Sequence, residues 1–302
     1  MTKVYENGTV ANRNISFEVV PGEILGVFGP NGSGKTTLIR QMVGLLRPSA
    51  GSILLMGSDL SKRPDMVPQH VGYLGQSESG FSAFTFRELI VHAGVHRGLT
   101  PRQACTEADE LIGMFGCSHI AGTLRFRLSG GERRLSLLLS ALIAQRSVLV
   151  LDEPTNELDP SHRTLVWQYL LAHSKDRGVS IVLVTHNVLE AETVVDRVAI
   201  IHHGLLIAIG TPGELKAEFG DSARVEITVR AGAEAYLPAE AERIHGQKWR
   251  MVVSRMYATQ LFNDFAAKAG SDAIDDFRIT SVSLEDVYGR LTRRADALSC
   301  KT

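Results

Sequence analysis

The chain has 302 residues, of which 44% are hydrophobic and 22% charged, and its formal net charge is −1. This composition is typical of a globular protein with enough chain for one large domain and an appendage, or for two modest domains. The near-zero charge excludes an overall field that would draw the protein to nucleic acid or anionic lipid, although it leaves room for a local basic patch.

The sequence also argues against export and against a membrane span. No apolar run approaches the length needed to cross a bilayer, and residues 1–14 lack the continuous apolar core of an export signal. The cysteines, Cys105, Cys117 and Cys300, have no metal-ligand spacing, so we expect inert thiols in a reducing compartment. Any membrane role would therefore depend on another polypeptide.

The first predicted elements are strands. Residues 3–20 read as short β pieces that form a small antiparallel sheet, and the turn at Pro21 and Gly22 leads into a buried strand over residues 24–28. Tyr5 lies where an aromatic ring could stack on adenine, and it could equally be a packing residue of a strand. Residues 36–46 carry apolar side chains at helical spacing.

A phosphate-binding loop joins this strand to this helix. The pattern G-x-x-x-x-G-K-[ST] is matched in full, with Lys35 and Thr36 as its last two residues. Glycines let backbone N–H groups converge on an anion, and the helix start adds a positive dipole end. Lys35 would reach the outer phosphates, and the Thr36 hydroxyl would complete a Mg²⁺ shell. The expected nucleotide contacts are Gly29, Pro30, Asn31, Gly32, Ser33, Gly34, Lys35, Thr36 and Thr37.

The next elements alternate between strands and helices. Residues 51–60 predict a strand and turn, and residues 71–75 a strand that ends at Gln76, whose side chain could reach metal or water at the edge of a parallel sheet. A helical block covers about residues 84–145. Further predictions are buried strands over 147–152 and 180–184, a hairpin over 197–209 that turns at Gly204, and a short helix over 211–219.

Two further segments carry chemistry. Asp152 ends an apolar strand, so it can hold Mg²⁺, and Glu153 can orient and deprotonate an attacking water. Acidic residues also end strands as plain solvated caps, and only the nearby phosphate loop favours the functional interpretation. Ser129 opens a leucine-rich helix through Gly130 and Gly131, which makes a second anion-binding helix start or an ordinary capped helix.

Taken together and in this order, these motifs resemble the nucleotide-binding subunit of ABC transporters over nearly the whole chain. GPNGSGKTT at 29–37 is similar to Walker A, LSGGE at 128–132 to the signature motif, and VLVLDEP at 148–154 to Walker B with its catalytic glutamate. Gln76 resembles the Q-loop glutamine and His186 the switch histidine. LDP at 158–160, which contains Asp159, resembles the D-loop.

The resemblance implies ATP and Mg²⁺ as cofactors and a head-to-tail homodimer. In such a dimer, Ser129 and Gly131 of one copy contact the γ-phosphate held by Lys35 of the other, and Gly130 and Asp159 are also expected among the nucleotide-binding residues. Glu153 is then the general base, while Gln76 and Asp152 assist Mg²⁺ and water, and His186 touches the γ-phosphate. The implied fold is α/β: a mostly parallel core sheet, an antiparallel β subdomain, a helical subdomain and a small C-terminal α+β appendage.

The chain departs from the family pattern at three places. Glu132 stands where glutamine is most often found, and Glu157 stands where a small residue is usual, and each could alter how two subunits meet. Tyr5 also follows almost no preceding strand, so we expect a short first edge strand or a truncated start.

The last part of the chain refines the resemblance. Residues 1–219 are assigned to the ATPase domain and residues 220–302 to an α+β accessory domain for regulation, pairing or docking. The tail, with SLEDVYGRLTRR at 283–294, resembles the extension of type-2 exporter ATPases, the group of daunorubicin-resistance-like proteins. This implies a separate membrane permease contacted by about residues 76–100, and a position at the cytoplasmic face of the cell membrane.

Two alternatives stay open at this point. A soluble ABC ATPase could act on ribosomes or nucleic acid through the arginine cluster Arg125, Arg127, Arg133 and Arg134, although tandem ATPase units or a coiled-coil insertion are not evident. A regulatory subunit could bind ATP without turnover, but Asp152 and Glu153 together argue against it.

Overall fold

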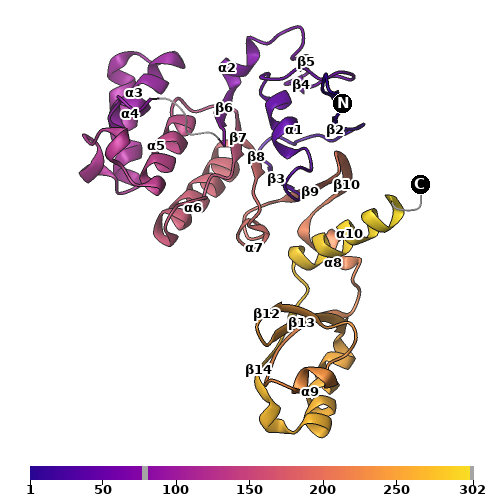
Figure 1. Ribbon diagram of the computed structural model, residues 1–302. Coiled ribbons are helices and arrows are strands. Elements are labelled where there is room, and N and C mark those ends of the chain that lie inside the picture. Colours follow the sequence, from indigo (N-terminus) through magenta and orange to yellow (C-terminus); the bar gives the residue numbers. More distant parts are fainter. Residues whose placement is uncertain (77–80, 300–302) are drawn as a thin grey trace. The chain divides into compact units, whose positions relative to one another are not determined.

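The computed structural model describes residues 1–76 and 81–299. The chain forms two compact units, Met1–Gly210 and Thr211–Thr302 (Figure 1). The sequence placed the division after Phe219, nine residues later than the structure does, since 219 − 210 = 9. The short helix α8 (Pro212–Ala217) falls in the second unit because it packs against α10 (Leu284–Ser299).

The first unit is built on a mostly parallel sheet. Its strand order is β10-β9-β3-β8-β7-β6, in which β10 alone runs antiparallel to its neighbour within the described residues. The strands are β3 (Ile24–Phe28), β6 (Val71–Leu74), β7 (Val148–Asp152), β8 (Ser180–Val184), β9 (Arg197–His202) and β10 (Leu205–Gly210). They carry the continuous apolar runs expected of strands that are covered on both faces.

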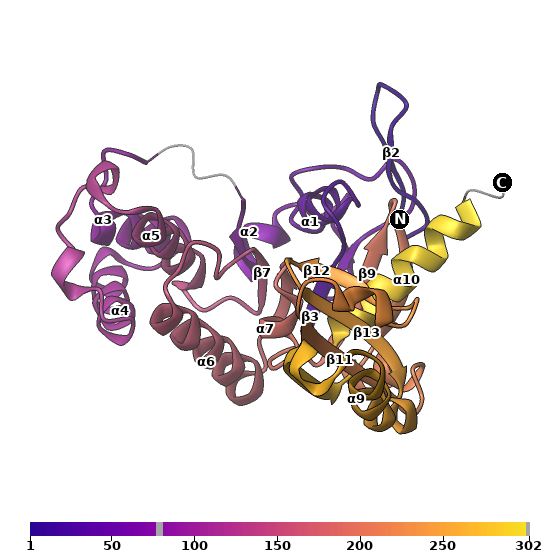
Figure 2. The same cartoon turned by 60° about the horizontal axis from the view of Figure 1, so that its bottom comes forward.

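Helices surround this sheet in two groups. α1 (Lys35–Met42), α2 (Met66–His70), α6 (Pro160–Arg177) and α7 (Val188–Ala191) belong with the sheet. α3 (Phe86–His96), α4 (Pro101–Met114) and α5 (Gly130–Leu142), with the 3₁₀ turns η1 (Ser118–Ile120) and η2 (Arg125–Arg127), form the expected helical block. Both views show this block gathered to one side of the sheet, and α5 packs on the edge strand β6 (Figures 1 and 2).

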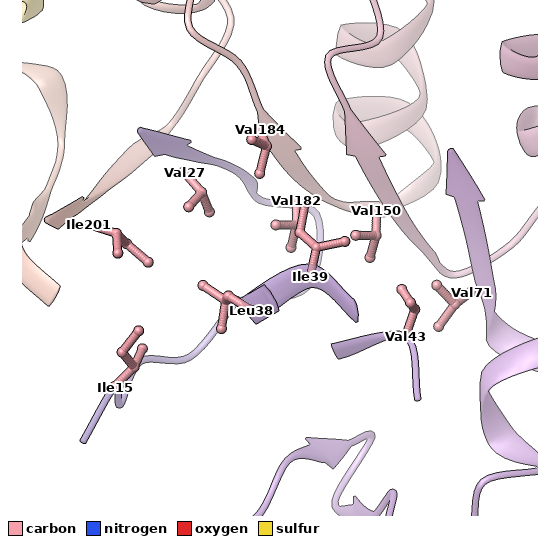
Figure 3. Close-up of a cluster of buried hydrophobic side chains, with 10 residues drawn as sticks. All are labelled: Ile15, Val27, Leu38, Ile39, Val43, Val71, Val150, Val182, Val184 and Ile201. Carbon is pink, nitrogen blue, oxygen red and sulfur yellow. The ribbon is translucent and has the colours of Figure 1, made fainter. Parts of the chain in front are cut away.

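The core lies between α1 and the sheet. Ile39 of α1 points at Val150 and Val182 of two neighbouring strands, as Figure 3 shows. Ile39 is fully buried, which removes a large apolar area from water and stabilises the fold by roughly 2 kcal/mol at this one position. The helix that begins at the phosphate loop is therefore held firmly against the strands that carry the acidic residues.

The antiparallel part is smaller than predicted. β1 (Lys3–Val4) pairs with β2 (Val10–Asn12), and β4 (Leu54–Leu55) pairs with β5 (Ser58–Asp59). Residues 13–20, predicted as a strand, are not in strand pairing, so this expectation was wrong. Phe17 and Val19 nevertheless pack against the core, because alternation of apolar residues serves packing even where no neighbouring strand is hydrogen bonded.

The second unit is an α+β domain, as predicted. An antiparallel sheet in the order β12-β13-β11-β14 consists of β11 (Ser222–Val229), β12 (Glu242–His245), β13 (Lys248–Ser254) and β14 (Ile274–Ser281). The helix α9 (Arg255–Ala269) packs against it, and η3 (Ala233–Tyr236) and η4 (Ser271–Ala273) complete the unit. β11 alternates buried and half-buried residues along its whole length, so one face forms the core and the other carries charges.

The described residues include no helix with both the length and the hydropathy that a bilayer crossing demands.

The edge strand β12 was not predicted, because its sequence, ERIH, has no alternation of apolar and polar residues. All four of its residues are exposed in the structure.

Candidate functional site

The phosphate loop occupies the turn between β3 and α1, as the sequence predicted. Gly34 caps α1 with φ of +103°, a left-handed conformation that suits glycine, and a Cβ there would lie 2.2 Å from the Ala11 carbonyl oxygen. A Cβ at Gly29 would lie 2.2 Å from the Ile201 carbonyl oxygen. Neighbouring backbone therefore enforces both glycines.

Lys35 lies folded against its own loop. Its Nζ donates to the carbonyl oxygens of Gly29 at 2.7 Å and Pro30 at 2.8 Å. Burial lowers the pKa of Lys35, and the carboxylates of Glu153 and Asp152 oppose that effect. The ammonium thus lies between the loop and two acidic groups, where the phosphates of a nucleotide can engage it.

A cavity of about 590 Å³ opens beside Lys35. It gathers residues from the loop, from the ends of β6, β7 and β8, and from two segments that no motif marked. Its predicted members are Asn31, Gly32, Gly34, Lys35, Thr36, Thr37, Gln76, Asp152 and Glu153. Its unforeseen members are Thr9, Val10, Ala11, Val184, His203 and Gly204.

The other predicted loop contacts lie around this cavity. Ser33 is buried in the loop, and Gly29 and Pro30 carry the carbonyls that hold Lys35. The hydroxyl of Tyr5 lies 3.1 Å from Oγ1 of Thr37, which places its ring beside the start of α1. Tyr5 is not among the residues that line the cavity, and its adenine contact stays a prediction.

Glu153 and His186 form a hydrogen-bonded pair at the ends of β7 and β8. The Glu153 Oε1 atom lies 2.8 Å from His186 Nδ1 and accepts the backbone N–H of His186 at 3.0 Å. Glu153 has φ of +53°, which is unusual for a residue with a side chain, and its N–H donates to the Val184 carbonyl at 2.8 Å. Such strain is often retained where a side chain must point at a reacting group.

Asp152 is a buried carboxylate beside Lys35. Burial raises its pKa to about 6, Glu153 adds to that rise, and Arg134, Lys35 and Arg40 oppose it. Its Oδ2 atom is buried and has no hydrogen-bond partner among the described residues. A buried carboxylate oxygen that accepts no hydrogen bond is suited to bind a hard cation such as Mg²⁺.

Oxygen donors in the cavity fit Mg²⁺. Asp152, the Thr36 hydroxyl and the Gln76 amide all line the same space, and such oxygens together with phosphate are the ligands that Mg²⁺ prefers. The residues present therefore match the metal that the sequence predicted.

The LSGGE segment lies outside this cavity. Ser129 caps α5 in a capping box, where it accepts the Glu132 N–H at 3.3 Å and donates its own N–H to Glu132 Oε2 at 2.7 Å. Glu132, which stands where glutamine is most often found, therefore makes both hydrogen bonds of the capping box. Ser129, Gly130 and Gly131 do not line the cavity that holds Lys35 in the same chain.

Asp159 is also engaged within its own chain. Its carboxylate caps α6 by accepting the N–H groups of Ser161 at 3.0 Å and His162 at 3.1 Å, and it lies 2.5 Å from the His162 Nδ1 atom. The Ser161 hydroxyl also donates to this carboxylate; it is the main cause that lowers the pKa of Asp159, and the bonds from His162 add to it. The side chain is a helix cap in this structure, outside the residues that line the cavity.

Half of the arginine cluster is internal. Arg125 is 2% exposed and Arg134 is 4% exposed, so neither can lie on a nucleic-acid backbone. Arg127 is exposed and Arg133 is half-buried, so the cluster offers a smaller basic surface than the sequence suggested.

Comparisons with known proteins identify the family of this chain. A family model described as ABC transporter matches residues 12–156, and a second, described as AAA domain, putative AbiEii toxin, Type IV TA system, matches residues 124–192. The daunorubicin/doxorubicin resistance ATP-binding protein DrrA of Streptomyces peucetius is 38% identical, over 80% of this chain and 73% of that protein. The Nod factor export ATP-binding protein I of Mesorhizobium japonicum is 31% identical, over 97% of this chain and 85% of that protein. A solved structure titled "Structure of ATP binding subunit of ABC transporter" has a TM-score of 0.67 and 25% identity, over 72% of this chain and 90% of that one.

The fold and site define a P-loop nucleoside triphosphatase with a helical block and an LSGGE helix. The chain belongs to the ABC transporter ATPase family. Its cofactors are ATP, with Mg²⁺ as the usual ion, and its reaction is ATP hydrolysis coupled to transport.

Proposed function

We propose that this chain is the ATPase of an exporter and that it hydrolyses ATP at the cavity beside Lys35. The observation that carries the proposal is Glu153, which lines the same cavity as Lys35 and Asp152 and lies 2.8 Å from the His186 Nδ1 atom; His186 itself is not among the residues that line the cavity. The amides of the loop from Gly29 to Gly34 hold the phosphates, and Lys35 supplies a point charge to the outer ones. Thr36, Gln76 and Asp152 would hold Mg²⁺, which would neutralise charge on the phosphate oxygens.

Glu153 is the general base. Its carboxylate takes a proton from the attacking water. His186, 2.8 Å away, fixes the orientation of that carboxylate and would contact the γ-phosphate of the bound nucleotide. The His186 side chain is 69% exposed, so it is accessible to a nucleotide that enters the cavity.

The site is completed by a second copy. Ser129, Gly130 and Gly131 present a helix start that does not line the cavity of their own chain, and two chains arranged head to tail would bring each helix start to the partner's phosphate. Asp159, as the cap of α6 next to Glu157 and Leu158, lies in the loop that meets the partner at this joint.

The permease contact falls on the helical block. A cavity of about 340 Å³ is lined by apolar and polar residues of β6, α3 and α5, including Tyr73, and by the rings of Phe81 and Phe84. Phe81 is 54% exposed, and its ring lies 6.0 Å from the ring of Phe84, so the two rings together form an exposed apolar surface that we expect the permease to cover. The predicted contact covered residues 76–100, of which residues 77–80 lie outside the described residues.

The relatives' names favour an exporter. One is a daunorubicin/doxorubicin resistance protein and another a Nod factor export protein, so cargo of the drug, lipid or polysaccharide type is the proposal for this chain. A peripheral position at the cytoplasmic face follows, because the ATPase must be bound to a permease where ATP is available. The ribosome or nucleic-acid alternative has no support in the comparisons.

The proposal is tested with Glu153→Gln. Turnover of ATP should fall by roughly 10²- to 10⁴-fold, because a positioned base contributes about that much, while Mg·ATP binding stays intact. Size-exclusion chromatography of this variant with Mg·ATP should reveal a dimer. Adding Ser129→Arg should leave nucleotide binding by the monomer intact and abolish the dimer. Normal turnover of Glu153→Gln, or a dimer that survives Ser129→Arg, would contradict the proposal.

A further inference from the structure

Arg134 connects the LSGGE helix to the strand ends that carry the reacting groups. It lies in α5, five residues after Ser129 (134 − 129 = 5), and its side chain is buried. Its Nη1 donates to the carbonyl oxygen of Gly75 at 2.8 Å, and its Nη2 donates to that of Glu153 at 2.9 Å and to that of Asp152. One guanidinium therefore binds the backbone at the ends of both β6 and β7.

Those carbonyls belong to the segments that aim the reacting groups. Gly75 precedes Gln76, and Asp152 and Glu153 are themselves residues of the site. Glu153 has φ of +53°, with its N–H held by the Val184 carbonyl and its own carbonyl held by Arg134. A strained residue keeps its conformation only where neighbouring groups over-determine it. The hydrogen bond from Arg134 to the Glu153 carbonyl is one of the bonds that hold Glu153 in this conformation.

We infer that Arg134 is a positioning residue that transmits the docking of the LSGGE helix on a partner's nucleotide to Glu153 and Gln76. The inference rests on the proposed role of Glu153. α5 is a continuous helix from Gly130 to Leu142, so a movement at its first turn is carried rigidly to Arg134, about 7.5 Å further along the axis. The planar guanidinium can hold two strand ends at once, which a lysine ammonium on a flexible stem cannot do in the same geometry.

Arg97 provides a matched control. It is a half-buried arginine of the helical block, and its Nη1 donates to two backbone carbonyls, Ala141 at 2.8 Å and Ile143 at 2.9 Å, at the far end of α5. Burial lowers its pKa to about 10. Arg97 shares the backbone-carbonyl contacts of Arg134, although it is less buried, and its bonds do not reach the ends of β6 and β7.

The test compares Arg134→Lys with Arg97→Lys in the full chain. We measure kcat and KM for ATP hydrolysis, equilibrium affinity for a fluorescent ATP analogue, and thermal unfolding. Arg134→Lys should lower kcat roughly tenfold or more with nucleotide affinity within about twofold, because positioning rather than binding is lost. Arg97→Lys should lower the melting temperature and leave kcat within about twofold. Equal losses of kcat in the two variants, or a loss confined to affinity, would overturn the inference.

A measurement on the unmodified protein covers the case in which Arg134→Lys does not fold. Hydrogen exchange with and without a non-hydrolysable ATP analogue should reveal protection at residues 129–134 that rises together with protection at residues 152–155. Protection of the first segment alone overturns the inference. Turnover retained by Glu153→Gln would instead defeat the proposed function, so the two failures are distinguishable.

Discussion

Two regions of this molecule differ in how their carboxylates are paired. At the ends of β7 and β8, Asp152 is buried with an Oδ2 atom that lacks a hydrogen-bond partner among the described residues, and burial raises its pKa to about 6. On the outer face of the second unit, Glu226 receives Lys248 at 2.6 Å and Arg224 at 2.5 Å, and these partners lower its pKa.

The second network continues beyond Glu226. Arg224 also donates to Ser283 at 3.2 Å and lies 3.6 Å from Asp286, while Arg250 pairs with Glu285 at 3.0 Å. These groups satisfy one another, so the network needs no ligand. The contrast teaches how to tell a site from a structural ion network: a costly, incompletely paired buried charge marks a place where a ligand completes the structure.

The strongest test of this contrast is Asp152→Asn. A carboxylate whose pKa is raised to about 6 destabilises the folded state at neutral pH, so the neutral amide should stabilise the protein by about 1–3 kcal/mol at pH 7 and abolish Mg²⁺-dependent turnover. The folded protein binds the proton more tightly than the unfolded chain, so the penalty grows as pH rises from about 4 to 6 and is complete above that window.

Denaturation midpoints of the Asp152→Asn and unmodified proteins at pH 7 and pH 5 check this expectation. The advantage of the variant should be smaller at pH 5. A variant that is less stable at both pH values would mean that the Asp152 charge is fully compensated within the chain.

The counterpart in the second unit is Glu226→Gln, for which the opposite sign is expected. Removing the charge leaves Arg224 and Lys248 with a weaker acceptor and should cost about 1 kcal/mol at pH 7. Because the pKa of Glu226 is lowered, the stability it contributes is present above about pH 4.3 and is lost as pH falls through the folded pKa. Calorimetry of the second unit's transition measures the change, with ATP turnover as the control. If Glu226→Gln were more stable than the unmodified protein, the carboxylates of both regions would destabilise the fold, and the contrast between them would be wrong.

The smallest expected effect concerns Glu157. This residue has φ of +64°, and its carboxylate Oε2 lies 2.7 Å from where a Cβ of Gly130 would be, next to the start of α5. Glu157→Gly should stabilise the protein by about 0.5–1 kcal/mol through relief of strain. Removing the carboxylate from the helix start should also favour docking of a phosphate there, so ATP-dependent dimerisation should strengthen. Glu157→Ala is the control, since it removes the charge and keeps the Cβ. A Glu157→Gly protein that is less stable would refute the strain.

Much of the fold and part of the site could be predicted from the sequence. The phosphate loop, the buried strands that end at Asp152 and Val184, and the LSGGE helix start each lie within a short stretch. The contacts of Tyr5 and the division after Gly210 could not be predicted in the same way, because they depend on which segments pack together. Residues 13–20 illustrate the limit: their alternation predicts an extended chain, but pairing requires a neighbouring strand.

The sequence by itself determined the chemistry available to this protein: an anion-binding loop with Lys35, two acidic residues after one strand, and a second helix start at Ser129. Glycine geometry, helix dipoles and side-chain charge act locally, so they can be read from adjacent residues. Only the tertiary structure decided that Glu153 meets His186, that Arg134 holds two strand ends, and that Ser129 lies outside its own chain's cavity. These relations join residues far apart in the sequence, and they are set by how the strands and helices pack.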